Sequence, residues 1–84
     1  MRKSKRAKKK FKEILGDSPN FITPDVIDYY QTDKYYIELS KGVFMKKKMY
    51  GVTVLDTEGN HLHDKSQSFK SMKDAEEYIE EELS

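Results

Sequence analysis

Basic side chains are the residues of this sequence best suited to binding chemistry, and half of them lie in its first twelve residues. This segment carries eight lysines and arginines and no acidic residue, so its charge is +8. Such side chains neutralise backbone phosphates and release counterions, which gives nucleic-acid affinity without sequence preference. Another acidic partner, contact with the acidic remainder of the chain, or a solubilising terminus would use the same charges. The candidate phosphate contacts are Arg2, Lys3, Lys5, Arg6, Lys8, Lys9, Lys10 and Lys12.

A second basic group, Lys46, Lys47 and Lys48, stands between apolar residues and is followed by Tyr50. Basic residues interleaved with aromatic ones grip a nucleic-acid backbone and stack on bases. These three lysines and Tyr50 are therefore further candidate contacts. The alternative is a solvated hairpin tip, where lysines protect a strand edge from unwanted pairing.

Acidic residues dominate the rest of the chain. The 72 residues after residue 12 hold 8 basic and 15 acidic side chains, so they carry −7, and the net charge of +1 hides a bipolar molecule. One helical face near the C-terminus is acidic and suits a basic protein partner, or mimics nucleic-acid phosphates; the alternative is a solvated helix face. A tyrosine expected on the outer face of a strand suits a protein interface, and strand propensity with core packing is its alternative explanation. These candidate protein contacts are Tyr36, Glu76, Glu77, Glu80 and Glu81.

Catalytic and metal-binding patterns are weak or missing. The chain has no cysteine, no phosphate-binding or dinucleotide glycine motif and no nucleophile elbow. His61 and His63 alternate near Asp56, Glu58 and Asp64, but this spacing is equally typical of a polar edge strand. We therefore predict a protein that is not an enzyme and has no metal or cofactor.

The basic segment and the lysine group must be positioned by a small fold. With 36% apolar and 37% charged residues, 84 residues predict one domain with a thin core and some unfolded chain. We expect residues 1–10 to be a flexible arm, because only Ala7 among them, besides the initiator, is apolar. Residues 11–84 then form a single α+β domain.

Local patterns divide this domain into elements. Capping residues and apolar spacing predict short helices at residues 8–15 and from Thr23-Pro24-Asp25 onward. Alternation predicts strands at 35–39, 49–55 and about 61–69, with turns at 40–42 and 56–60. Ser71 and Asp74 begin a helix over 72–83 with a stripe of apolar residues. The expected architecture is a three-stranded antiparallel meander, about residues 34–69, packed against the C-terminal helix and preceded by one or two short helices.

No apolar stretch is long enough for a signal peptide or a membrane span, so we expect a cytoplasmic protein that is a monomer or weak homodimer and does not contact membranes.

The last strands and helix resemble a known family. Residues 50–54 (YGVTV), the turn at Gly59, Phe69-Lys70-Ser71 and Asp74-Ala75-Glu76 resemble the arm-type DNA-binding domain of phage and transposon integrases over roughly residues 34–83. The resemblance implies a sheet that contacts DNA through Lys46, Lys47, Lys48 and Tyr50. The short, Lys/Glu/Tyr-rich chain also looks like the accessory proteins of phages and mobile elements.

These observations predict a small, non-enzymatic accessory protein that binds nucleic acid, DNA rather than RNA, through its basic arm and a sheet surface. The alternative is a phage or mobile-element inhibitor or adaptor that contacts a host protein through its acidic helix or an exposed strand edge.

Overall fold

A computed structural model describes residues 2–15 and 25–83 of the protein. These residues form five strands and two helices. The elements in chain order are β1 (Arg2–Lys3), α1 (Lys5–Leu15), β2 (Asp25–Gln31), β3 (Tyr35–Phe44), β4 (Lys47–Asp56), β5 (Gln67–Phe69) and α2 (Met72–Glu82). The strands form one antiparallel sheet in the order β1-β2-β3-β4-β5, so each strand pairs with its neighbour in sequence. The expected α+β class and meander are confirmed, with a larger sheet than the three strands predicted.

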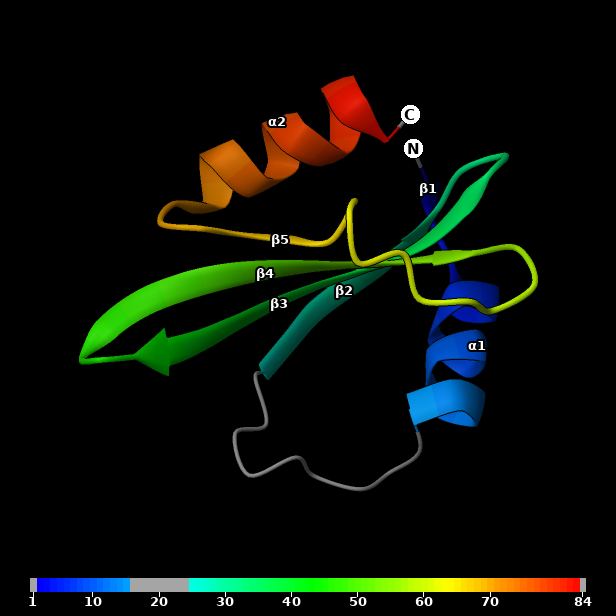
Figure 1. Ribbon diagram of the computed structural model, residues 1–84, viewed down its shortest axis with the longest axis horizontal. Helices are drawn as coiled ribbons and strands as arrows, with labels where there is room; N and C mark the ends of the chain where they lie inside the picture. The colour runs from blue at the N-terminus through cyan, green and yellow to red at the C-terminus, as the bar shows by residue number, and fades with distance from the viewer. Residues whose placement is uncertain (1, 16–24, 84) are drawn as a thin grey trace.

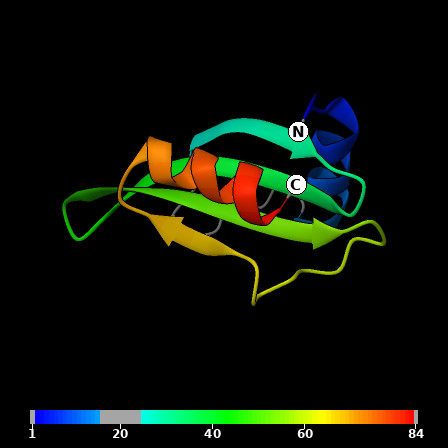
Figure 2. The same ribbon diagram turned by 90° about the horizontal axis from the view of Figure 1, so that it is seen from above.

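The two helices lie on opposite faces of the sheet (Figures 1 and 2). Because side chains alternate along a strand, Ile37 and Leu39 of β3 point to one face and Tyr36 points to the other. Ile37 and Leu39 pack against α2, whereas Tyr36 packs against α1. The sheet therefore holds two separate apolar clusters, one beneath each helix.

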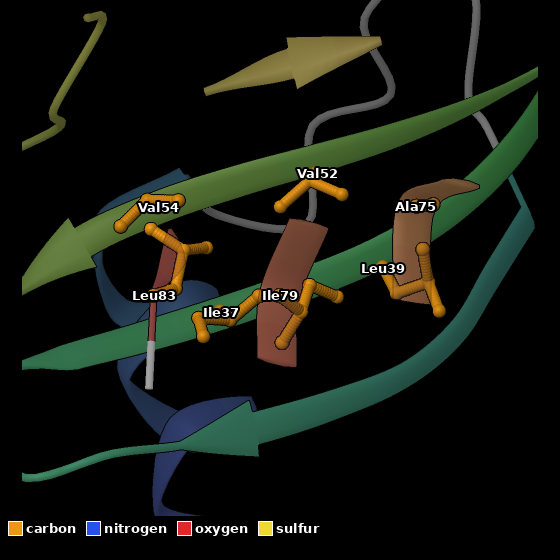
Figure 3. Packing of buried hydrophobic residues seen from close by; sticks show 7 residues of the cluster. All are labelled: Ile37, Leu39, Val52, Val54, Ala75, Ile79 and Leu83. Carbon is orange, nitrogen blue, oxygen red and sulfur yellow. The ribbon is translucent and has the colours of Figure 1, made fainter. Parts of the chain in front are cut away.

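The larger cluster lies between α2 and the central strands (Figure 3). The stripe Ala75, Ile79 and Leu83 packs on aliphatic side chains of β3 and β4, and all of these residues are buried. Burying one such aliphatic side chain contributes roughly 1.5–3 kcal/mol. The predicted cap is also confirmed, because Ser71 Oγ accepts a hydrogen bond from the Asp74 backbone amide at 3.1 Å.

The smaller cluster fixes α1 to the sheet. Ala7 and Phe11 are one helical turn apart and both are buried against Tyr36 and Leu55. The Phe11 ring also lies 5.6 Å from that of Tyr29, between centroids. The expectation of an arm separate from the domain is therefore wrong: residues 2–15 form β1 and α1. Ala7 is small enough to let the helix approach the sheet closely, so Phe11 reaches an apolar site.

Two other predicted elements are replaced by strand. Residues 25–31 form β2 rather than a helix, because Ile27 and Tyr30 pack on the α2-side core while the backbone pairs with β3. Thr23 and Pro24, which carried the predicted helix start, lie outside the described residues. The predicted turn at residues 40–42 is also strand: Ser40 is buried, and its Oγ donates to the Gly51 carbonyl at 3.5 Å.

The β3–β4 hairpin therefore turns later than predicted, at Met45-Lys46, whose φ angles are 51° and 66°. In contrast, the predicted turn between Asp56 and Asn60 is confirmed, with Gly59 at φ 95°. The Asp56 carboxylate accepts hydrogen bonds from the backbone amides of Glu58 (2.9 Å) and Asn60 (2.8 Å). The third predicted strand is reduced to Gln67–Phe69, with one isolated bridge between Leu55 and His61.

Candidate nucleic-acid interface

Helix α1 presents most of the basic residues predicted to contact phosphates. Its buried residues, Ala7 and Phe11, mark its inner side, and most of its other described side chains are exposed. Six of its eleven residues are basic and one is acidic, which gives the helix a charge of +5. Lys10 is half-buried; the exposed basic residues are Lys5, Arg6, Lys8, Lys9 and Lys12. The structure thus gathers five predicted contacts on one outward surface, which we call the basic face of α1.

Within the part of the chain that the structure describes, no ion pair neutralises the basic face. Lys5, Lys8, Lys9 and Lys12, with Glu13, line an open surface depression of about 370 Å³. Among the described residues, the ion pairs formed are Lys3–Asp28 and Lys73–Glu77, and neither uses a residue of α1. The charges of the basic face are therefore available to an anionic ligand.

Strand β1 carries the other two predicted contacts of the basic segment, Arg2 and Lys3. Lys3 Nζ lies 3.0 Å from Asp28 Oδ2, and the hydrogen bond and charge of Asp28 raise the pKa of Lys3. This pairing makes Lys3 a weaker phosphate contact than the lysines of the basic face.

The second basic group lies far from α1. Lys46, Lys47 and Lys48 are all exposed at the tip of the β3–β4 hairpin. Figure 1 shows this tip and α1 at opposite ends of the longest axis. Tyr50 is half-buried and packs against the α2-side core, opposite Phe69 of β5. The structure therefore keeps the three lysines together but places the Tyr50 ring partly in the core.

The tip of this hairpin is unusual in composition. A two-residue hairpin turn with positive φ at both positions is type I′, which strongly prefers Asn and Gly. Met45 and Lys46 occupy these positions instead, which destabilises the turn by roughly 1–2 kcal/mol per residue. The sequence pattern did not single out Met45, because its role depends on where the hairpin turns.

Helix α2 carries the opposite charge on the opposite face. It has six acidic residues and one basic residue, hence −5, and Glu76, Glu77, Glu80 and Glu81 are exposed. Tyr36, the other predicted protein contact and expected on the exposed face of its strand, is 8% exposed and lies under α1. It does point away from Ile37, as predicted, but that face is covered.

The helix ends hold charges that do not favour helix stability. Lys5 and Arg6 lie at the positive end of the α1 dipole, whose first turn has no acidic residue. Glu80, Glu81 and Glu82 lie at the negative end of α2, whose last turn has no basic residue. Each such charge is unfavourable by about 0.3–1 kcal/mol. Helix stability therefore does not explain this distribution of charge.

The two histidines lie together, with ring centroids 4.0 Å apart. His61 Nε2 is 3.1 Å from Ser66 Oγ, and partial burial followed by the charge of His63 lowers the pKa of His61. Within residues 2–15 and 25–83, no three His, Asp or Glu side chains are grouped as metal ligands would be.

Comparisons of this chain with protein-family models, with curated proteins and with solved structures found no match. The resemblance to integrase arm-type domains therefore stays a prediction. Neither described helix is long and apolar enough to cross a membrane.

Proposed function

We propose that this protein is a small, non-enzymatic accessory protein that binds nucleic acid through the basic face of α1, with the β3–β4 hairpin as a second contact. The observation that carries the proposal is a helix of charge +5, fixed to the sheet by Phe11, whose basic side chains pair with no described carboxylate. DNA is the first ligand to test because of the resemblance to integrase arm-type domains.

Fixing the charges on a docked helix strengthens the case for binding. A disordered arm loses conformational entropy when it binds, whereas a preformed helix has already lost most of it on folding. Lysine and arginine contacts to phosphates carry no base information, so the expected binding is largely independent of sequence. Acidic α2 on the other face repels phosphates and thereby orients the protein on its ligand.

Charge substitution tests the proposal without removing core residues. Removing residues 1–10 would delete Ala7 and most of α1, so loss of binding would be confounded with loss of fold. We suggest instead Lys5→Gln, Lys8→Gln and Lys12→Gln combined, with Lys34→Gln, Lys70→Gln and Lys73→Gln as the matched control. All six lysines are exposed, and both variants lose three charges.

Affinity for a short labelled DNA duplex is then measured over a series of salt concentrations. Each neutralised phosphate contributes about 0.9 to the slope of log K against log salt. We expect the α1 variant to bind more weakly, with a slope that is smaller by about 0.9 for each phosphate it no longer neutralises, and the control to resemble the wild type. Equal weakening in the two variants, or no wild-type binding at low salt, would disprove the proposal.

The second candidate is an inhibitor or adaptor that binds a basic host protein through α2. It is favoured by the exposed acidic face and by the glutamates at the negative end of that helix. The same titration separates the two functions, because an adaptor of this kind needs no affinity for DNA. Glu76→Gln with Glu77→Gln would weaken the adaptor interaction and leave DNA binding unchanged or stronger.

A further inference from the structure

Among the described residues, the β3–β4 hairpin ends as a two-stranded ribbon. β2 pairs with β3 only as far as Lys41, and β5 pairs with β4 only as far as Tyr50. Beyond these residues, β3 and β4 pair with each other up to Phe44 opposite Lys47, and with no other strand that the structure describes. No other described strand is bonded to residues 42–49, and both Figure 1 and Figure 2 show the ribbon projecting past the helices.

The tip of this ribbon combines apolar and basic side chains. Met45 is 80% exposed and Val43 is 61% exposed, which makes them the two most exposed large apolar residues among those described. Lys46, Lys47 and Lys48 are exposed immediately beside them. An apolar side chain gains nothing from a phosphate, so a ligand contact that stabilises Met45 must be one from which it displaces water.

Base steps of a DNA duplex offer such a site. Proteins that bend DNA insert an apolar side chain between two base pairs from the minor groove, while basic residues neutralise the phosphates on either side. A lipid surface is the less favoured partner, because membrane affinity grows with buried apolar area and the tip's exposed large apolar side chains, among those the structure describes, are Val43 and Met45. The lysines provide the charge complementarity that a duplex requires.

We infer that the hairpin tip is a DNA-bending wedge in which Met45 inserts at a base step and Lys46, Lys47 and Lys48 contact the flanking phosphates. This rests on the proposed nucleic-acid binding and names its substrate as duplex DNA that deforms easily. The residues at the type I′ turn fit this role. Met45 adopts a positive φ less easily than Asn would, but it places an apolar side chain at the apex of the hairpin.

The decisive variant is Met45→Asn, with Met45→Leu as its control. Asn adopts positive φ more easily, so Met45→Asn is expected to keep or raise the unfolding temperature, which separates function from folding. Both variants retain every lysine. Met45→Leu retains an apolar apex, whereas Met45→Asn does not.

Bending is measured by energy transfer between dyes at the two ends of a duplex, and substrate preference by competition between an intact duplex and one with a central mismatch. For the wild type and Met45→Leu we expect bending and about tenfold tighter binding to the mismatched duplex, since an unpaired step is easier to open. For Met45→Asn we expect both the bending and the preference for the mismatched duplex to be abolished.

Wild-type binding without bending, or bending that survives in Met45→Asn, would overturn the wedge and leave the proposed function standing. Absence of DNA binding in all variants would overturn both. Vesicles of phosphatidylserine and phosphatidylcholine provide the last comparison: binding to them that Met45→Asn abolishes, without DNA bending, would assign the tip to a lipid surface instead.

Discussion

At the scale of single residues, Glu38 is an ionisable group on the sheet face beneath α1, and burial there changes its pKa. Its side chain is half-buried beside Tyr29, with which it forms a hydrogen bond. Burial raises the pKa of Glu38, and the bond to Tyr29 offsets only part of this effect. Burial and the charge of Glu38 also raise the pKa of Tyr29. Folding therefore favours the neutral form of the Glu38 side chain over the charged carboxylate.

This shift predicts a pH dependence of stability. Because the folded protein binds the Glu38 proton more tightly than the unfolded chain, this residue lowers stability as pH rises through and above its unfolded pKa, about 4.3. We expect Glu38→Gln to raise the free energy of unfolding at neutral pH by roughly 1 kcal/mol, the low end of the cost of an incompletely paired polar group.

Urea titrations of both proteins between acidic and neutral pH measure this difference. The advantage of Glu38→Gln should vanish as the pH falls below the unfolded pKa, where the wild-type carboxyl is also neutral. The exposed Glu58→Gln serves as the control and should change little across the range. A Glu38→Gln variant that is less stable at neutral pH would show that the carboxylate is favoured where it lies.

At the scale of elements, α1 is fixed to the sheet through two buried residues among those described. Ala7 and Phe11 are its buried residues, and Phe11 is 1% exposed. We expect Phe11→Ala to cost about 3–5 kcal/mol and to release α1 from Tyr36 and Leu55. Hydrogen exchange of the α1 amides and the free energy of unfolding would measure this. Lys9→Ala, on the exposed side, should leave both unchanged within about 0.5 kcal/mol; equal effects would contradict the docking of α1 through Phe11.

The elements that could be predicted are those whose signals are local. Helix α2 has its cap at Ser71 and its stripe within eleven residues, and strand β4 alternates regularly. Strand β2 could not be predicted, because its pairing with β3 outweighs the local helix-start pattern. The turn at Met45-Lys46 could not be predicted either, because neither residue favours positive φ and the register with β4 decides where β3 ends.

At the scale of the whole molecule, the sheet separates two helices of opposite charge, +5 on α1 and −5 on α2. The sequence predicts a bipolar chain, but as a free cationic arm joined to an anionic body. The arrangement on opposite faces follows from long-range contacts of Phe11 and Ile79, which bury against different sides of the same strands. The basic residues of the candidate site could therefore be predicted from the sequence, but their arrangement on a helix docked against the sheet could not.

The central claim is that nucleic acid binds to the face that carries α1 and to the hairpin tip, and not to α2. The most direct test is to add a short DNA duplex to isotope-labelled protein at low salt and follow the backbone amide signals by NMR. We predict that signals of residues 5–15 and 43–48 shift in proportion to bound duplex, while those of residues 76–82 stay in place. Shifts confined to α2, or no shifts in any residue, would contradict the account.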